Sequence, residues 1–312
     1  MHKRLALPGI LTVAVALLLA GCGDDGGGGS AATGNSETLR VVATTTQVQD
    51  FARVIGGDQV QVTGILKPNV DAHDYEPSPA DLDAIARADV LIENGVGLEE
   101  WLQDTIRSAG FDGTLVDASQ GVQLREGGEE HAEGKDPHIW MDPRNAKVMV
   151  ANIERGLAEA RPSDAASFKT NLDGYTAQLD ALDASIAERI GGLANKKLVT
   201  NHDAFHYYVD RYGLEFVGSI IPSFDTSAEL SAKSVQDLVA KIKATKVKAI
   251  FSESSLPPET AEAIGREAGI KVVAGEDALY GDALGPAGSD ADTYLKMMEH
   301  NTSTIVAALS GT

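Results

Sequence analysis

Four short segments, far apart in the chain, each offer one side chain that can bind a metal ion. Three of these side chains are histidines and one is an aspartate: His73, His138, His202 and Asp282. Three imidazoles and one carboxylate complete a four-coordinate shell, which is the usual demand of a closed Zn²⁺ site. Two of the residues lie in the first half of the chain and two in the second. The sequence therefore predicts a metal ion held between two lobes.

The elements that must position these residues follow from an alternation of strand-like and helical patterns. Short runs rich in Val and Ile occur four times in each half: Leu39–Thr45, Val60–Leu66, Val90–Asn94, Thr114–Ala118, Lys197–Thr200, Glu215–Ile220, Val247–Ser252 and Ile270–Ala274. Amphipathic stretches lie between them, such as Pro79–Arg87, Leu98–Ala109, Ser234–Ala244 and Pro258–Ala268. Because such alternation is typical of parallel sheets covered by helices on both faces, we predict an α/β fold with two parallel-sheet lobes.

One segment between the two halves breaks the alternation. From residue 163 to residue 190, apolar side chains recur every three or four positions, which indicates one continuous helix: Phe168, Leu172, Tyr175, Leu179, Leu182, Ile186 and Ile190. Ser163 follows a proline and is the expected N-cap, and Gly191 ends the pattern. A coiled-coil dimer is the alternative, but only about four heptads are present. We therefore predict a rigid strut, roughly 42 Å long, that joins both lobes.

Each candidate ligand follows the end of a predicted strand. His73 comes after the second run of the first half, and His202 comes closely after the first run of the second half. His138 and Asp282 lie beyond the last runs of their halves. Ligands of open α/β sheets bind beyond the carboxyl ends of the strands. Two such edges facing each other form one cleft, so we expect the metal site at the lobe interface.

The N-terminus has the pattern of a secretion signal. A short basic region precedes an apolar run, Leu5–Leu19, that is too short for a permanent membrane span. The small residues before Cys22 resemble the lipobox of bacterial lipoproteins, which implies that residues 1–21 are removed and that Cys22 is lipidated. We expect a flexible Gly-rich tether in residues 22–38, an N-terminal lobe in residues 39–162, the linking helix in residues 163–192 and a C-terminal lobe in residues 193–312.

The composition excludes several kinds of partner. A net charge of −20 argues against binding to nucleic acid or to an anionic membrane surface, and it is compatible with cations. Membrane contact is therefore expected through the lipid anchor only. Cys22 is the only cysteine, so intrachain disulfides and thiolate metal sites are excluded.

Several motifs around the four candidates resemble a known family. They are Lys67-Pro68-Asn69 with His73 and Tyr75-Glu76-Pro77, then Asp136-Pro137-His138-Ile139-Trp140-Met141-Asp142-Pro143, then Leu279-Tyr280-Gly281-Asp282, and the run Thr293–Asn301. They resemble the cluster A-I solute-binding proteins, lipoproteins that deliver zinc or manganese to ATP-binding-cassette importers. The resemblance runs from about Leu39 to the C-terminus. It implies a rigid fold with a long helix and a metal at the lobe interface, held by His73, His138, His202 and Asp282.

The third ligand bears on the choice of metal. In that family this position is often His in zinc-binding members and Glu in manganese-binding members, and here it is His202. Imidazole suits zinc, whereas carboxylate and carbonyl oxygens suit manganese. We predict Zn²⁺ as the transported ion, with Mn²⁺ as the alternative. His206, four residues later, is expected to be a packing or rim residue.

The fourth ligand has a competitor. Asp277 and Asp282 both precede a small and then an aliphatic residue, which is the order that the family shows after its ligand. The continuation Gly285–Ser289 favours Asp282.

Other side chains are expected to support the site. Residues that accept the free N–H groups of the imidazoles orient them, and the candidates are Glu253, Asn201 and Asp142. An acidic, Gly-rich loop precedes His138, and relatives often carry a His-rich loop there. Here the loop is either a solvated segment or a metal-recruiting one, through Glu129, Glu130, His131 and Glu133.

These observations predict an extracytoplasmic receptor, anchored by lipid to the cell membrane, that captures Zn²⁺ without chemical turnover. The expected partner is the permease of an ATP-binding-cassette metal importer, with a periplasmic metallochaperone as a second candidate, and the protein is expected to be a monomer. The rival class is a zinc hydrolase. A catalytic zinc keeps one position open for water, whereas four protein ligands close the site.

Overall fold

The structure is a computed structural model that describes residues 38–126 and 134–310. The predicted signal peptide, the predicted lipidation site Cys22 and all but the last residue of the predicted tether lie outside the described residues, as do Glu129, Glu130, His131 and Glu133. The described residues belong to one compact unit, Thr38–Thr312. None of their helices combines the length and apolarity that a membrane span needs.

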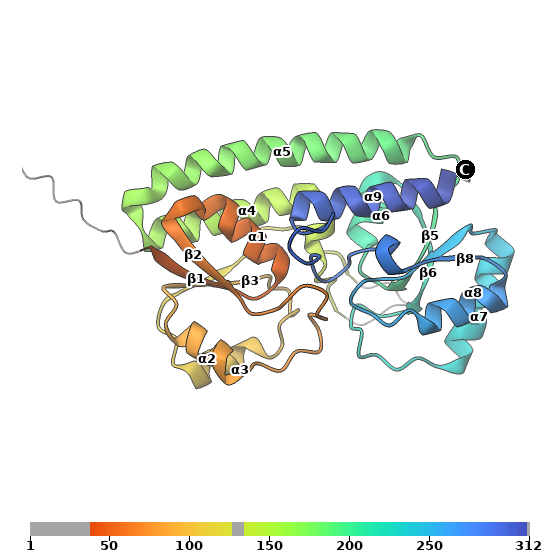
Figure 1. The fold of residues 1–312 in the computed structure, drawn as a ribbon, viewed down its shortest axis with the longest axis horizontal. Helices are drawn as coiled ribbons and strands as arrows, with labels where there is room; N and C mark the ends of the chain where they lie inside the picture. The colour runs from red at the N-terminus through yellow and green to blue at the C-terminus, as the bar shows by residue number, and fades with distance from the viewer. Residues whose placement is uncertain (1–37, 127–133, 311–312) are drawn as a thin grey trace, which may run out of the picture. The chain divides into compact units, whose positions relative to one another are not determined.

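The first lobe is built on a four-stranded parallel sheet. Its strands, in the order β2-β1-β3-β4, are β1 (Leu39–Ala43), β2 (Val60–Gly64), β3 (Val90–Glu93) and β4 (Thr114–Asp117). Figure 1 shows α2 (Pro79–Ala86) and α3 (Leu102–Ala109) on one side of this sheet, and α1 (Thr46–Gly56) and α4 (Pro143–Ala160) on the other. The prediction of a parallel sheet with helices on both faces is confirmed for this lobe.

The second lobe divides its strands between two shorter ladders. β5 (Lys197–His202) pairs with β6 (Glu215–Ile221), and β7 (Ala249–Phe251) pairs with β8 (Lys271–Val273), both in parallel. The helices of this lobe are α6 (His206–Tyr212), α7 (Ala232–Thr245), α8 (Glu259–Ala268) and α9 (Tyr294–Ser310). A single bridge between Glu253 and Leu279 continues the second ladder toward the loop that carries Asp282.

The long helix lies across both lobes, as the sequence predicts. Figure 1 shows α5 (Ala165–Gly191) running along one side of the whole molecule, with α4 and α1 beneath one half and α9 (Tyr294–Ser310) beneath the other. Six of its predicted apolar residues are buried: Phe168, Tyr175, Leu179, Leu182, Ile186 and Ile190. Most of the buried apolar side chains among the described residues form one core that includes residues of both lobes and of this helix. A shared core and a continuous helix both oppose large rotations of one lobe against the other.

The N-cap of the long helix differs from the prediction. Pro162 starts a short 3₁₀ turn, Pro162–Asp164, so Ser163 lies inside this turn and not at its border. A capping residue needs extended backbone before the first helical turn. Asp164 is the residue that precedes α5, and its side chain makes no capping hydrogen bond. The prediction of Ser163 as the N-cap is therefore wrong.

Candidate metal centre

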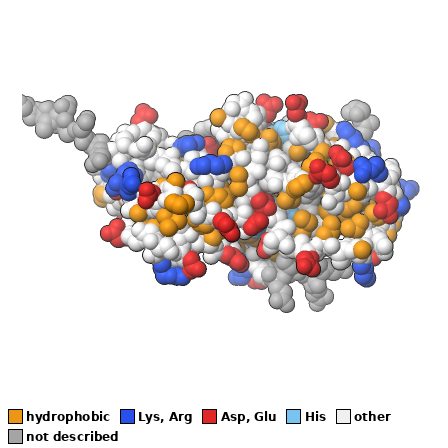
Figure 2. Space-filling view, turned by 60° about the horizontal axis from the view of Figure 1, so that its bottom comes forward, with side chains coloured by type: hydrophobic (Ala, Val, Ile, Leu, Met, Phe, Trp, Pro, Cys, Tyr) orange, Lys and Arg blue, Asp and Glu red, His pale blue; other side chains and the backbone are white. Residues whose placement is uncertain are grey.

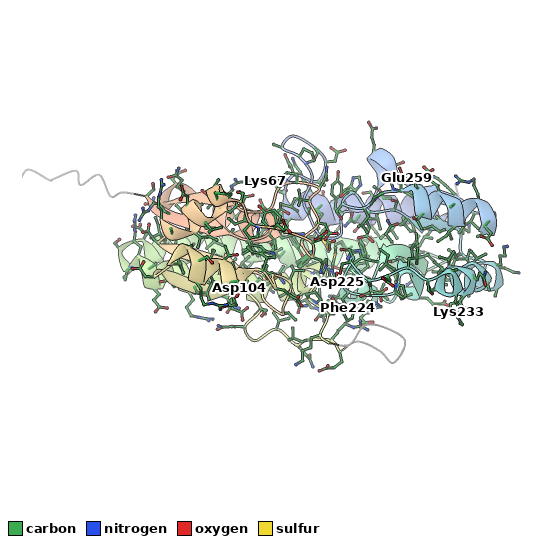
Figure 3. All side chains as sticks on the ribbon, turned by 90° about the horizontal axis from the view of Figure 1, so that it is seen from below. Lys67, Asp104, Phe224, Asp225, Lys233 and Glu259 are labelled. Atoms are coloured by element: carbon green, nitrogen blue, oxygen red, sulfur yellow. The ribbon has the colours of Figure 1, made fainter. Side chains whose placement is uncertain are left out.

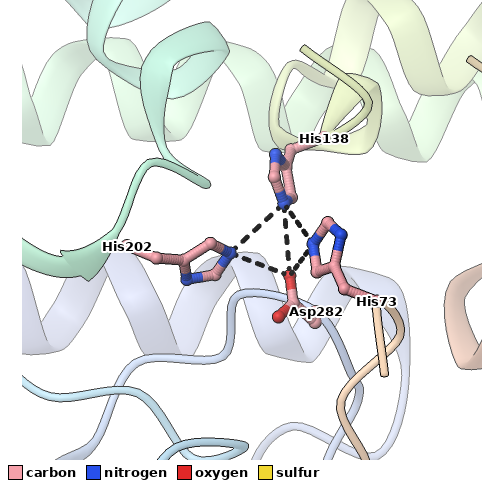
Figure 4. A group of neighbouring side chains, drawn as sticks. All are labelled: His73, His138, His202 and Asp282. Atoms are coloured by element: carbon pink, nitrogen blue, oxygen red, sulfur yellow. Dashed lines mark hydrogen bonds and ion pairs between the residues drawn. The ribbon is translucent and has the colours of Figure 1, made fainter. Parts of the chain in front are cut away.

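The four predicted ligands meet at one point between the lobes. One ligand atom from each of His73, His138, His202 and Asp282 lies within 4.8 Å of every other one. Figure 4 shows the three imidazole rings converging on the carboxylate, with each side chain arriving from a different segment. Within the part of the chain that the structure describes, this is the one group of His, Cys, Asp and Glu residues with such a geometry.

Four of the separations between the ligand atoms match a tetrahedral shell. The His138 Nε2 atom lies 3.2 Å from the His73 Nε2 atom and 3.3 Å from the His202 Nε2 atom. The Asp282 Oδ1 atom lies 3.3 Å from the Nε2 atoms of both His138 and His202, and 3.9 Å from that of His73. Ligands about 2.0 Å from a tetrahedral zinc ion are separated by about 3.3 Å. The spacing between His73 and Asp282 is wider than this value, and all four ligand atoms lie within 4.8 Å of one another.

Each ligand is placed by the end of a strand or by a tight turn. His202 is the last residue of β5, and His73 lies in the loop that follows β2. His138 immediately precedes the 3₁₀ turn Ile139–Met141, which leads into α4. Asp282 lies in the loop after β8. The carboxyl ends of the sheets of both lobes thus supply the site, as the position of the ligands in the sequence predicts.

The carboxylate at the centre is buried without a hydrogen-bond donor. The side chain of Asp282 is fully buried, and neither of its oxygens has a hydrogen-bond partner among the described residues. A buried carboxylate without donors is costly unless a cation compensates it. The three Nε2 atoms that face it are therefore the means by which the fold tolerates this charge.

The electrostatics of the cluster are dominated by this carboxylate. Burial raises the pKa of Asp282, but the imidazoles of His202, His138 and His73 outweigh burial and hold that pKa well below its usual range. For His202, burial is outweighed by the Asp282 and Glu253 carboxylates, which raise its pKa well above the ordinary value. Burial lowers the pKa of His73 to about 4, against the opposing effect of Asp282. The cluster therefore attracts a positive charge, which either a proton or a metal ion can supply.

Two further carboxylates hold the imidazoles in place. The Oδ1 atom of Asp136 lies 2.8 Å from the Nδ1 atom of His138 and also accepts the backbone N–H of His138. The Oε2 atom of Glu253 lies 2.9 Å from the Nδ1 atom of His202, and its Oε1 atom accepts the backbone N–H of His202. Carboxylates in these positions leave the Nε2 atoms free to face the ion. Glu253 is among the residues predicted to support the site, whereas Asp136 was missed although it stands two residues before His138 in the same motif.

The other predicted residues lie elsewhere. Asp142 caps α4 by accepting the backbone N–H of Arg144 and pairs with the guanidinium of the same residue. The Asn201 side chain is buried, and its Oδ1 atom has no hydrogen-bond partner among residues 38–126 and 134–310. His206 packs against the ring of Phe216, and its Nε2 atom lies 3.7 Å from the Asp203 carboxylate. Asp277 is exposed in the turn Gly275–Asp277, so the structure brings Asp282 and not Asp277 to the imidazoles.

A pocket opens from the cluster to the surface on the His73 side. Its cavity of about 300 Å³ is lined by residues of both lobes: His73, Val96, Gly97, Leu98, Glu100, Gly134, Lys135, Pro137, Phe224 and Asp225. His73 is the only one of the four ligands that lines it. Figure 3 shows Phe224 and Asp225 near the middle of the underside of the molecule. At about 30 Å³ per water molecule, the cavity has room for an ion with its water shell.

The surface around this face has no single dominant charge. Figure 2 shows acidic, basic and hydrophobic side chains interspersed over it, with acidic ones near its middle. The negative net charge of the chain and the acidic groups Glu100 and Asp225 at the pocket favour the approach of a cation.

Comparison of the sequence with known families gives a match over most of the chain. The profile of the family described as "Zinc-uptake complex component A periplasmic" matches residues 41–308. Among curated proteins, the manganese-binding lipoprotein MntA of Bacillus subtilis is 34% identical over 303 residues, covering 93% of this chain and 95% of its own. The iron transporter substrate-binding lipoprotein MtsA of Streptococcus pyogenes is 30% identical over 320 residues, covering 99% of this chain and 100% of its own.

Solved structures show the same fold. The periplasmic zinc-binding protein TroA of Treponema pallidum superposes with a TM-score of 0.81 and 32% identity, covering 88% of this chain and 99% of its own. A zinc-bound deletion mutant of ZnuA superposes with a TM-score of 0.77 and 25% identity, covering 88% of this chain and 100% of its own. The two-lobed arrangement is thus shared with proteins that hold metal ions.

Proposed function

This chain belongs to the periplasmic zinc-uptake component A family, the metal-binding receptors of ATP-binding-cassette importers, and we propose that it captures Zn²⁺ with His73, His138, His202 and Asp282. The ion is the cargo of the protein. Its mechanism is coordination followed by release to the membrane components of the importer.

The single observation that carries this proposal is the buried carboxylate of Asp282. Three Nε2 atoms face it, and neither of its oxygens accepts a hydrogen bond within the described part of the chain. A divalent ion at that point satisfies all four groups at once. The metal enters as the imidazoles lose their protons, because only the neutral ring offers a lone pair on Nε2.

The donor set supports zinc over manganese. Three imidazoles are a nitrogen-rich shell, and four of the separations among their ligand atoms and that of Asp282 fit a tetrahedron. Manganese remains the second candidate, because the Oδ2 atom of Asp282 has no hydrogen-bond partner among the described residues and is available for a bidentate, five-coordinate shell. The named relatives include manganese-binding and iron-transporting lipoproteins. The choice between zinc and manganese therefore rests on the donor set and not on the names of the relatives.

The proposed function also implies how the receptor is attached to the membrane and which partner it serves. We propose that Cys22 carries the lipid anchor, that residues 22–38 form the tether, and that a monomer with lobes of residues 39–162 and 193–312, joined by the helix of residues 163–192, presents zinc to a permease and its ATPase. A tether raises the local concentration of the receptor near the permease. Bound zinc performs no hydrolysis in this proposal, because the fourth protein ligand occupies the position that a catalytic water needs. A hydrolysis assay on the zinc-loaded protein tests that point.

The test of the function is metal analysis of the purified protein. Elemental analysis of protein prepared without added metal, followed by competition between zinc and manganese in equilibrium dialysis, is expected to show one zinc per chain and preference for zinc. Preference for manganese under equal free concentrations would establish the second candidate. The absence of both metals, with no uptake on addition, would contradict the proposal as a whole.

A further inference from the structure

The loop that carries Asp282 is fastened to the lobe opposite its own strands. The indole Nε1–H of Trp140 donates to the carbonyl oxygen of Gly281 at 3.1 Å. On the other side of Asp282, the backbone N–H of Leu284 donates to the Oγ1 atom of Thr46 at 2.8 Å. Both bonding partners are outside the second lobe: Thr46 starts α1, and Trp140 lies in the turn before α4. The residues before and after the carboxylate are therefore both held from the first lobe.

Trp140 also belongs to the segment that carries another ligand. It lies two residues after His138, and the two rings pack with their centroids 5.4 Å apart. The backbone oxygen of Trp140 accepts the hydroxyl of Tyr294 at 2.7 Å. The indole is completely buried, as is the Tyr294 ring. One side chain thus connects the turn that bears His138 to the loop that bears Asp282, and its own position is fixed from α9.

The loop is also attached to its own lobe. The backbone N–H of Tyr280 donates to the Oδ1 atom of Asn301, and the carbonyl of Tyr280 accepts the Nδ2 group of the same residue. A side chain at position 281 would displace the Glu253 carboxylate, because a Cβ atom there would lie 2.2 Å from its Oε2 atom, the oxygen that faces His202. The loop therefore has little freedom to move, and the indole N–H determines how closely the carbonyl before Asp282 approaches the His138 turn.

We propose that Trp140 is a positioning residue for the metal: its indole N–H sets the distance between Asp282 and His138 and so determines the geometry of the shell. This inference rests on the proposed function, since it assigns how that same site is held. Thr46 is the second anchor of the same loop. Loss of either bond lets the carboxylate move away from the imidazoles, which weakens binding and disturbs the tetrahedral arrangement.

The test is Trp140→Phe, which keeps a buried aromatic ring and removes the N–H. Zinc affinity is measured by competition with a chelating indicator, and shell geometry by the visible absorption of the Co²⁺-substituted protein, which distinguishes tetrahedral from higher coordination. We expect zinc affinity to fall by about tenfold or more, the range for loss of a partner that orients a ligand. We also expect the Co²⁺ spectrum to change, which a general loss of stability alone does not cause.

Trp101→Phe is the matched control. Trp101 is the only other tryptophan, and its buried Nε1 atom has no hydrogen-bond partner among the residues that the structure describes. The same substitution there should change neither zinc affinity nor the Co²⁺ spectrum. Equal behaviour of Trp140→Phe and wild type, with both binding zinc, would overturn the inference alone. Failure of the wild type to bind zinc or Co²⁺ would instead overturn the proposed function.

A second variant tests the same inference if circular dichroism shows that Trp140→Phe does not fold. Thr46→Val is nearly isosteric and removes the oxygen that accepts the Leu284 N–H, whereas Thr46→Ser retains that oxygen. We expect Thr46→Val to weaken zinc binding and alter the Co²⁺ spectrum, and Thr46→Ser to restore both. Wild-type binding in a folded Thr46→Val protein would contradict the anchoring of the loop.

Discussion

Two buried carboxylates at the junction of the lobes have pKa values that are shifted in opposite directions. Asp282 faces three imidazoles, and they hold its pKa well below the ordinary value despite burial. Asp50, on α1, accepts one backbone N–H from Tyr294, and burial raises its pKa from 3.8 to about 6. Arg53 and that backbone N–H oppose the shift, but they do not outweigh burial.

The difference shows what separates a binding site from a structural contact. Both carboxylates lie near α1 and the C-terminal segment, and both hold segments that are distant in sequence. At Asp50 the fold reduces the cost of burial by favouring the protonated acid. At Asp282 the fold keeps the charge and supplies imidazoles that release their protons to solvent when a metal ion binds. A buried carboxylate kept ionised by facing imidazoles is therefore the mark of the site, and burial by itself is not.

The largest effect is expected from removing the charge at the site. Asp282→Asn keeps the shape of the side chain and removes its charge, so the three imidazoles lose their counter-charge and the ion loses its only anionic ligand. Zinc affinity should fall by more than about 100-fold, beyond the range seen for partners that only orient a ligand. Titration calorimetry measures it. Asp50→Asn is the matched control and should bind zinc as the wild type does. Comparable losses in the two variants would remove the distinction between the two carboxylates.

Removing the charge at the other carboxylate should stabilise the fold. A carboxyl whose folded pKa is raised contributes stability that is present below its unfolded pKa, 3.8, and lost as the pH rises through about 6. Asp50→Asn avoids this loss. Above pH 6, its free energy of unfolding should exceed that of the wild type by on the order of 3 kcal/mol, since each pKa unit corresponds to about 1.4 kcal/mol. Urea denaturation of the metal-free proteins at pH 4 and pH 8 measures this, and an equal difference at both values would contradict it.

Much of this arrangement is predictable from the sequence. The eight strands follow from their Val- and Ile-rich runs, and the long helix follows from its apolar repeat, because both patterns depend on local spacing. The four ligands could be proposed because each stands in a short motif after a strand. The choice of Asp282 over Asp277 depended on the continuation Gly285–Ser289, since both aspartates fit the same short rule, and the path of the loop brings Asp282 to the imidazoles.

The supporting residues depend on tertiary contacts and are harder to predict. Glu253 reaches His202 across 51 positions of sequence, although its place at a strand end indicated it. The motif made Asp142 a candidate for orienting an imidazole, but the structure uses it as the N-cap of α4. Asp followed by Pro is also a pattern that starts helices. The bonds from Trp140 to Gly281 and from Thr46 to Leu284 join positions 141 and 238 residues apart. Neither bond has a local signal.

The thermal stabilities of the zinc-loaded and metal-free proteins should depend differently on pH. The raised pKa of His202 means that its proton stabilises the metal-free fold below the unfolded value of 6.5, and that this contribution is lost as the pH rises through the folded pKa. Zinc takes the place of that proton. The increase in Tm on adding zinc should therefore grow as the pH rises from 5.5 to 8, and zinc affinity should change by about tenfold per pH unit for each displaced proton. Scanning calorimetry with and without zinc measures the increase in Tm. A constant increase in Tm would show that no ligand proton is displaced.

The smallest expected effect tests whether the three imidazoles select the metal. His202→Glu replaces one nitrogen ligand with a carboxylate, so two acids share a shell with two imidazoles and the compensation around Asp282 becomes weaker. The preference for zinc over manganese should fall by roughly tenfold, or 1.4 kcal/mol. His206→Gln is the control, because the His206 ring packs against Phe216 and lies outside the ligand group. Competition dialysis compares the two variants. An unchanged preference in His202→Glu would mean that the geometry of the loop selects the ion, and the anchors at Trp140 and Thr46 would then be the residues to vary next.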